Sequence, residues 1–279
     1  MNAYYQLIKP GMVYGNAMTA LAVFLFASSQ HPSIPLLIAT LAGLSFSIAS
    51  GCVFNNIIDR DIDARMERTK VRAIPTKQIS VHHAFFFATA LGVVGIAILF
   101  FFTTTLTLLV TLFGVFAYLA LYTPAKRLTP HSTIIGALAG AVPPVVGYVA
   151  VTNMLDTTAV LLFLILVCWQ MTHFFAIAIF RLNDYKSAGL PVMPVFMGIA
   201  RTKVLMVVYA VLFSIAAYAL FLVNGLGTFY AVSMGILSAG WIGLSLSGLY
   251  THDDARWARR LFFYSIILLV GFSISIAYS

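Results

Sequence analysis

The chain has 279 residues, of which 61% are hydrophobic and only 9% are charged. Because a soluble domain carries about 25% charged residues, this composition excludes a soluble enzyme. The only two cysteines, Cys52 and Cys168, fall inside apolar runs, which excludes a secreted disulfide scaffold. Nine membrane helices of about 20 residues each would use most of the chain. The composition therefore favours an all-α, polytopic membrane protein that forms a single domain over residues 1–279.

Apolar runs separated by polar residues predict nine membrane spans. The narrowest break is Thr103-Thr104-Thr105, where we expect a tight turn because the surrounding apolar run is too long for one span. Pro143 and Pro144 lie inside the fifth span and predict a bend. The nine spans cover residues 12–28, 36–58, 83–103, 105–123, 132–152, 157–180, 203–223, 228–249 and 258–278.

The basic residues are confined to one set of connections. All sixteen Lys and Arg lie before the first span or after the second, fourth, sixth and eighth. Basic connections stay on the cytoplasmic side of a membrane, so we expect a cytoplasmic N-terminus and a C-terminus outside. This topology also accounts for the net charge of +8, and nucleic acid is not an expected partner.

A polar motif closes the second span. Asn55, Asp59 and Asp63 are spaced at i, i+4 and i+8, which places them within an arc of about 80° on one helix face. Two carboxylates and an amide resist desolvation unless a cation joins them. Mg²⁺ prefers such oxygen ligands together with phosphate oxygens. The spacing therefore predicts a magnesium site on these three residues.

The motif is followed by a basic segment that can bind phosphate groups, because guanidinium and ammonium groups bind phosphate oxygens. A solvated loop is the alternative for charges beside a membrane helix, and we expect it for Asp61, Glu67 and Lys77. A solvated loop explains Asn55, Asp59 and Asp63 less well, because this trio begins inside the apolar run and repeats every four residues. The basic residues predicted to bind a diphosphate are Arg65, Arg68, Lys70 and Arg72.

A second polar cluster closes the sixth span. His173 precedes Asp184 by eleven residues, so it lies about 16 Å deeper along a helix, near the middle of the bilayer. An ionisable group at that depth is typical of a functional site. A neutral histidine that is hydrogen-bonded to a neighbouring helix is the alternative.

The motif Asn55-x-x-x-Asp59-x-x-x-Asp63 resembles the first aspartate-rich motif of the UbiA-type intramembrane prenyltransferases. The longer string from Ser50 to Thr69, with Trp169–His173 and Asp184-Tyr185, closely resembles the protoheme IX farnesyltransferase branch of that family. The resemblance implies nine helices around a central cavity that opens to the cytoplasmic side of the inner membrane.

The resemblance also implies roles for individual residues. Asp59, Asp63, His173 and Asp184 would be catalytic, and the three carboxylates would bind Mg²⁺ with Asn55. His173 is a candidate ligand for haem iron, with the hydrogen-bonded histidine as the alternative. The family's second Asp-x-x-x-Asp motif is reduced here to Arg181 and Asp184, so we expect Asp59 and Asp63 to provide most of the coordination. The remaining substrate-binding residues that it implies are Tyr122, Lys126, Arg181 and Tyr185.

The activity implied is transfer of a farnesyl group from farnesyl diphosphate to the 2-vinyl group of haem B, with addition of water, to give haem O. Mg²⁺ would be the cofactor, and the chain would lie in membrane lipid. A haem A synthase or a terminal oxidase would be its protein partner. One alternative is a prenyltransferase of the same family that acts on an aromatic quinone precursor. A transporter is the other, although transporters place their polar groups at the midplane on broken helices.

Overall fold

The computed structural model describes residues 3–29 and 31–279, and over these residues it contains helices and no strands. Nine segments are long and apolar enough to cross a membrane, which confirms the predicted number of spans within the described ranges. Six of them are single helices: α2 (Pro10–Ala27), α3 (Ile34–Ile58), α5 (Val81–Phe102), α10 (Thr157–Phe180), α13 (Ile199–Asn224) and α15 (Asp254–Ala277).

The other three spans are composite. The fourth is α6 (Thr105–Phe116), the π-helix η1 (Ala117–Tyr122) and α7 (Thr123–Leu128). The fifth is α8 (Ser132–Gly140) and α9 (Val142–Thr152), and the eighth is α14 (Thr228–Ser247) and η2 (Gly248–Tyr250). Four short helices lie between spans or before the first: α1 (Ala3–Leu7), α4 (Arg60–Asp63), α11 (Leu182–Ser187) and α12 (Met193–Phe196).

Polar residues fix where several spans begin. The Ser80 hydroxyl accepts a hydrogen bond from the His83 amide at the start of α5, and Asp156 caps α10 through the Ala159 amide. Thr104 caps α6 in the same way, which explains how the long apolar run turns there. The fifth span, in which the prolines predict a bend, is interrupted at Ala141, just before Pro143 and Pro144.

Three spans extend beyond their predicted ends. α13 begins at Ile199 and α15 at Asp254, four residues earlier than predicted in each case, and α7 continues to Leu128. The added turns carry basic residues such as Arg201, Arg256 and Lys126. Hydropathy identifies the part of a helix inside the hydrocarbon, whereas long basic side chains allow the helix to continue into the interface.

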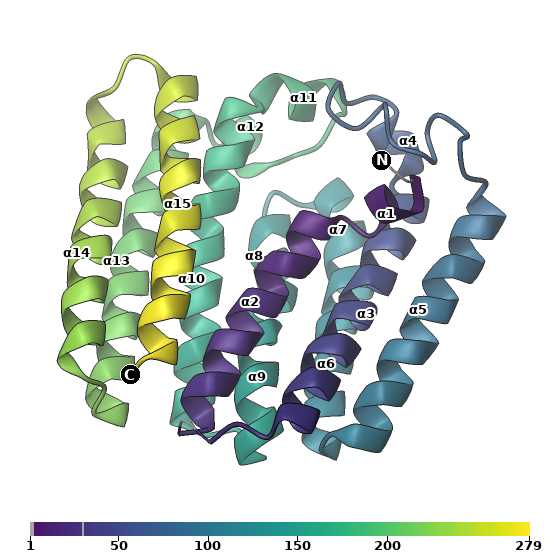
Figure 1. Ribbon diagram of the computed structural model, residues 1–279. Coiled ribbons are helices and arrows are strands. Elements are labelled where there is room, and N and C mark those ends of the chain that lie inside the picture. The colour runs from purple at the N-terminus through teal and green to yellow at the C-terminus, as the bar shows by residue number, and fades with distance from the viewer. Residues whose placement is uncertain (1–2, 30) are drawn as a thin grey trace.

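The helices form a ring. α2 contacts α3, α9 and α15, and α15 in turn contacts α10 and α14, so the first and last spans close the bundle (Figure 1). The largest apolar core lies among α10, α13, α14 and α15. The cavity described below lies toward the centre and is lined by residues of α2, α3, α10 and the fourth and fifth spans.

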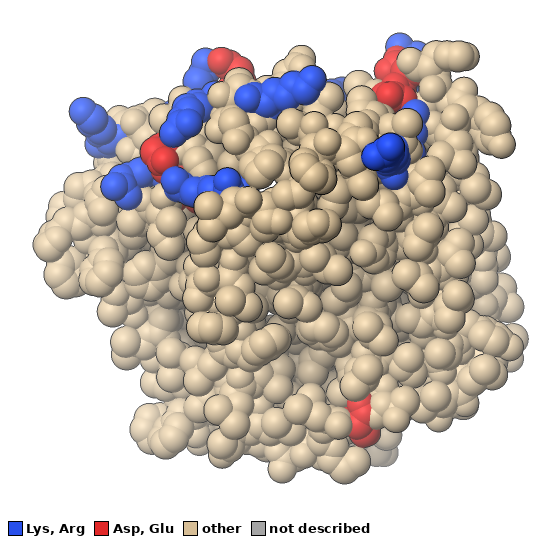
Figure 2. Space-filling model, turned by 180° about the vertical axis from the view of Figure 1, so that it is seen from behind, with Lys and Arg blue, Asp and Glu red and all other residues tan. Residues whose placement is uncertain are grey.

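The basic residues are confined to one end of the ring. Figure 2 shows Lys and Arg gathered at that end, with a wide band almost free of charged side chains beyond it. α1 and the C-terminus lie at opposite ends of the bundle (Figure 1). An odd number of spans requires this arrangement.

Candidate active site

The bundle encloses a cavity of about 620 Å³ whose two halves differ in chemistry. The deeper half is lined mainly by small and apolar side chains such as Leu44, Ile48 and Val142. The other half lies at the charged end and is lined by Lys9, Asn55, Asp59, Asp63, Arg68, Arg72 and Lys126. A cavity with one charged end and one apolar end suits an amphipathic molecule with a charged head.

The predicted trio Asn55, Asp59 and Asp63 lines this cavity together. α3 ends at Ile58, but the helical hydrogen-bond pattern continues across the junction. The Asp59 amide donates to the Asn55 carbonyl at 2.9 Å, and the Asp63 amide donates to the Asp59 carbonyl at 2.8 Å. The four-residue spacing therefore keeps the three side chains on one side, and each is at most 4% exposed.

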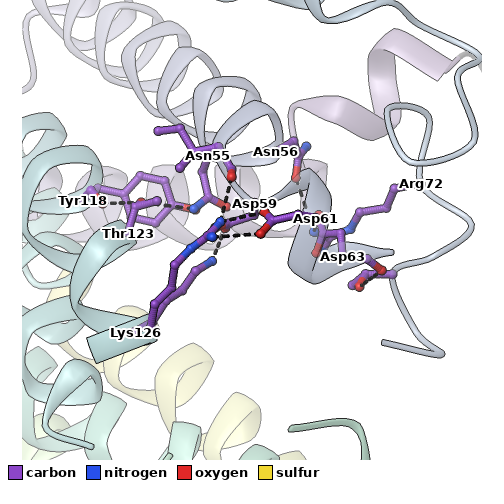
Figure 3. Close-up of polar contacts among 12 residues, drawn as sticks. Asn55, Asn56, Asp59, Asp61, Asp63, Arg72, Tyr118, Thr123 and Lys126 are labelled. Atoms are coloured by element: carbon purple, nitrogen blue, oxygen red, sulfur yellow. Dashed lines mark hydrogen bonds and ion pairs between the residues drawn. The ribbon is translucent and has the colours of Figure 1, made fainter. Parts of the chain in front are cut away.

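Both carboxylates are paired with cations from other segments (Figure 3). Arg72, in the loop after α4, donates from Nη1 to Asp63 Oδ2 at 2.7 Å. Lys126, on α7, forms an ion pair with Asp59 Oδ2. Because these segments are far apart in the sequence, only the folded chain assembles the cluster.

A third cation enters from the start of α2. Lys9 Nζ donates to Asn55 Oδ1 at 2.6 Å and lies 3.4 Å from the Tyr118 hydroxyl. Asn55 Nδ2 donates in turn to Thr123 Oγ1 at 3.1 Å, which fixes the orientation of the amide (Figure 3). Burial lowers the pKa of Lys9 to about 8, because desolvation disfavours the charged ammonium.

Asp61 lies on the other side of the short helix α4, as its position in the sequence predicts. Arg127 donates to both of its carboxylate oxygens, at 2.9 and 2.8 Å, and to the Ile58 carbonyl at 2.8 Å. This guanidinium lowers the pKa of Asp61. The pair joins α7 to the end of α3 and so supports the cluster from outside the cavity.

Two tyrosines reach the cavity from a π-helical turn. Pro124 has no amide hydrogen and its ring crowds the carbonyl four residues earlier, which favours a wider turn in η1. Thr123 Oγ1 donates to the Tyr118 carbonyl at 2.8 Å across this turn. The rings of Tyr118 and Tyr122 stack with centres 5.8 Å apart, and both line the cavity.

The residues fit a magnesium ion. Asp59 Oδ1 is buried and accepts no hydrogen bond from any residue that the structure describes, whereas most buried carboxylate oxygens have a donor. Arg127 Nη2 lies 3.6 Å from this oxygen. Together with Asp63 and Asn55, Asp59 offers the oxygen donors that Mg²⁺ prefers, which leaves other positions for phosphate and water.

The other predicted residues divide into two groups. Arg65 and Lys70 line no part of this cavity and instead pair with Asp61 (3.7 Å) and Glu67 (2.6 Å) on the exposed side of the loop. This is the solvated arrangement that the sequence predicts for the neighbouring Asp61, Glu67 and Lys77. The predicted substrate-binding residues that do line the cavity are Arg68, Arg72, Tyr122, Lys126 and Tyr185.

The second polar cluster lies apart from the first. Asp184, in α11, does not line the cavity, and within the described ranges no group of three His, Cys, Asp or Glu side chains converges on a metal site. Arg181 lines a separate cavity. The structure therefore does not bring Asp184 to Asp59 and Asp63, and a second metal pole at Asp184 stays a prediction.

His173 lies between two helices. Its Nδ1 is 2.6 Å from Ser265 Oγ on α15, and its ring stacks on Trp169 with centres 4.7 Å apart. The residue lines neither cavity. This geometry corresponds to the alternative in the sequence analysis, a histidine hydrogen-bonded to a neighbouring helix.

Sequence reasoning missed Lys9, Tyr118, Thr123 and Thr69 as site residues. Lys9 precedes the first span and belongs to the stretch Lys9-Pro10-Gly11 that matches the family, but the sequence assigns it no role in the site. Thr69 is buried and its hydroxyl donates to the Asp63 carbonyl at 2.9 Å, which anchors the loop below the trio. No spacing rule connects these residues, because they come from four segments.

The whole chain is similar in sequence to several bacterial proteins named protoheme IX farnesyltransferase. It is 42% identical over 280 residues to the protoheme IX farnesyltransferase of Acinetobacter baylyi, an alignment that covers 100% of this chain and 96% of the relative. A structure of digeranylgeranylglyceryl phosphate synthase superposes with a TM-score of 0.81 at 18% identity, covering 99% of this chain and 98% of the other.

A second solved structure adds ligands to the comparison. A UbiA homologue from Archaeoglobus fulgidus bound to GPP and Mg²⁺ superposes with a TM-score of 0.70 at 17% identity, covering 100% of both chains. At this identity the similarity establishes the fold alone. Residues 16–267 match the UbiA prenyltransferase family, and with the 42% identical relative this match places the chain in its family. The chain belongs to the UbiA prenyltransferase family.

Proposed function

We propose that the chain transfers a farnesyl group from farnesyl diphosphate to the 2-vinyl group of haem B and so gives haem O and diphosphate. The observation that carries this proposal is the cavity itself. Three cations surround two buried carboxylates at one end, and the rest is largely apolar. The cavity thus matches a diphosphate head with a prenyl tail, and the name of the 42% identical relative supports the acceptor.

Asn55, Asp59 and Asp63 would hold the magnesium ion, and Asp184 remains the predicted second pole. When bound there, Mg²⁺ supplies Lewis-acid stabilisation of the negative charge that develops on the departing diphosphate. The buried Oδ1 of Asp59, which accepts no hydrogen bond from the described residues, and the Mg²⁺ in the structurally similar homologue support this assignment.

The chain's own cations bind the diphosphate. Each ammonium has three donors and each guanidinium five, so Lys9, Arg72 and Lys126 can contact phosphate oxygens in addition to the partners that they have now. Their positive charge lies where negative charge accumulates as the carbon–oxygen bond breaks. Positioning these groups in advance avoids the reorganisation that water would require.

The apolar half of the cavity protects the reaction. Departure of diphosphate leaves an allylic cation, and walls such as Leu44, Ile48 and Val142 keep water from capturing it. The terminal vinyl carbon of haem B then forms the new carbon–carbon bond, which leaves a cation on the inner vinyl carbon. Water adds to that carbon and loses a proton, which gives the hydroxyethyl-farnesyl substituent.

The stacked tyrosines face the same space. A ring face within about 6 Å of a cation stabilises it electrostatically. Tyr118 and Tyr122 are therefore our candidates for residues that stabilise the allylic cation, and the π-helical turn holds their rings.

The proposal extends to the cellular setting. The charged end faces the cytoplasm, where diphosphate leaves to water, and the protein is a multi-pass protein of the inner membrane. Both substrates are lipophilic enough to reach the cavity from lipid. A haem A synthase or a terminal oxidase would receive the product.

Two carboxylate variants test the proposal. Purified protein in detergent is incubated with haem B, farnesyl diphosphate and Mg²⁺, and the extracted haem is analysed by mass spectrometry. We expect haem O from the unmodified chain, at least a hundredfold less from Asp59→Asn and Asp63→Asn, and normal yield from Glu67→Gln, whose exposed side chain pairs with Lys70 outside the cavity. A chelator should stop the reaction, and added Mg²⁺ should restore it.

Other outcomes would contradict the proposal. If a 4-hydroxybenzoate-type quinone precursor is prenylated and haem B is not, the chain acts on the other acceptor class. If no diphosphate is released with any acceptor while a solute crosses reconstituted vesicles, the transporter alternative holds. Full activity of Asp59→Asn would contradict the proposal that Asn55, Asp59 and Asp63 bind the magnesium ion.

A further inference from the structure

A second cavity, of about 420 Å³, lies between the ends of α10 and α15 at the charged end of the molecule. Its walls combine two kinds of side chain, guanidinium groups and phenyl rings. The residues that line it are Arg68, Ile177, Phe180, Arg181, Arg259, Phe262 and Phe263.

The guanidinium groups of this cavity have no acidic partner. Within the described residues, no carboxylate forms an ion pair with Arg68, Arg181 or Arg259, unlike Arg72 and Lys126 of the first cavity. Arg181 and Arg259 instead lie over the same ring, with their guanidinium carbons 5.5 and 5.8 Å from the centre of Phe180. The cavity is therefore positively charged and aromatic, which suits a flat molecule with carboxylate groups.

The two cavities share part of their lining. Arg68 and Ile177 belong to both, so a molecule held in the second cavity lies directly beside the space assigned to the prenyl diphosphate. The two propionates of haem B lie on the edge of the porphyrin opposite its vinyl groups. Propionates in the second cavity would therefore direct the vinyl edge toward the first.

We propose that the second cavity binds the acceptor, with Arg181 and Arg259 holding the propionates of haem B and the phenyl rings contacting the adjoining edge of the porphyrin. This inference rests on the proposed function, because it takes haem B as the acceptor. It specifies which substrate Arg181 binds, since the sequence predicts this residue only as substrate-binding. It also assigns Arg259, Phe262 and Phe263, which lie on the last span and outside both polar motifs.

Binding of two haems to purified protein tests the inference. Haem B and its dimethyl ester, in which both propionates are neutral, are titrated by absorbance. We expect Arg181→Gln and Arg259→Gln each to weaken haem B binding by about tenfold, the loss of one charge-assisted hydrogen bond at an exposed position. The unmodified chain should bind the ester about as weakly as the variants bind haem B, and the variants should lose little further affinity for the ester.

Two controls separate this inference from the proposed function. Arg260→Gln changes the neighbouring exposed arginine, which lines neither cavity, and should bind haem B normally. The KM for farnesyl diphosphate should not change in Arg259→Gln. Unchanged haem B affinity in both cavity variants, or a raised KM for farnesyl diphosphate instead, would overturn the acceptor site while farnesyl transfer stands. If haem B binding depends on these arginines but no haem O forms, the acceptor site stands and the proposed farnesyl transfer is overturned.

Discussion

Lys9 is the residue whose role depends most on the folded structure. Its Nζ lies 2.6 Å from Asn55 Oδ1 at the polar end of the cavity, so it can add a contact to the diphosphate. A hydrogen bond to a charged group contributes roughly 1.5–3 kcal/mol. We expect Lys9→Met to raise the KM for farnesyl diphosphate by about tenfold or more, measured by steady-state haem O formation, and Lys9→Arg to recover part of that loss.

Lys186→Met is the matched control for this change. Lys186 has the same side chain at the same charged end but is exposed on α11 and lines neither cavity. Its KM should match that of the unmodified chain. If both methionine variants behave alike, Lys9 acts through the overall positive field and not through the cavity.

At the residue scale, the sequence identified those site residues that one periodic motif connects. Asn55, Asp59 and Asp63 share a face because the helical pattern continues through Asp59, and four-residue spacing reports that face. Lys9 and Tyr118 could not be found in this way. Lys9 contacts Asn55, 46 positions away in the sequence, and Tyr118, 109 positions away. His173 shows the opposite problem, since its depth was predictable but the helix that it faces was not.

At the scale of elements, one close helix contact controls the width of the ring. A side chain added at Gly147, on α9, would collide with the backbone carbonyl of Ala20 on α2. A backbone atom cannot rotate away as a side chain can, so α2 and α9 would have to separate. Such overpacking typically costs about 1–3 kcal/mol.

We therefore expect Gly147→Ala to lower the midpoint of thermal unfolding in detergent by several degrees. Gly235→Ala is the control, because Gly235 lies in α14 with open space around it. Alanine favours a helix over glycine by roughly 0.5–1 kcal/mol, so the control should unfold at the same or a slightly higher temperature. A midpoint for Gly147→Ala equal to that of the control would show that α2 and α9 can separate freely.

The sequence predicted the spans because apolar runs report them directly, and Thr104 marked even the shortest break. It did not predict the turn at Ala117–Tyr122, since a π-helix and an α-helix have the same hydropathy. It also began the seventh and ninth spans too late and ended the fourth too early, because the turns that carry basic residues at the interface are not apolar. Element identity therefore followed from composition, whereas local geometry depended on Pro124 and Thr123.

At the scale of the whole molecule, the cavity follows from ring closure between α2 and α15. Helices that are apolar on every face give no periodic signal that separates the lipid side from the cavity side. The sequence could therefore predict a charged end but not which helices enclose the space beneath it. The charge distribution did predict one collective property, because the basic residues gather at a single end of the folded chain (Figure 2).

That asymmetry gives the last prediction, the orientation in the membrane. Positively charged connections stay in the cytoplasm, so the connection at 153–156 should face outward and α11 should face the cytoplasm. We expect Met154→Cys, exposed at the end that carries no basic residues, to react with a membrane-impermeant maleimide in intact cells stripped of their outer wall. Lys186→Cys should react only after lysis. The unmodified chain supplies the background, since Cys52 and Cys168 are both buried. The reverse pattern of labelling would turn the diphosphate cluster outward and contradict the proposed release of diphosphate to the cytoplasm.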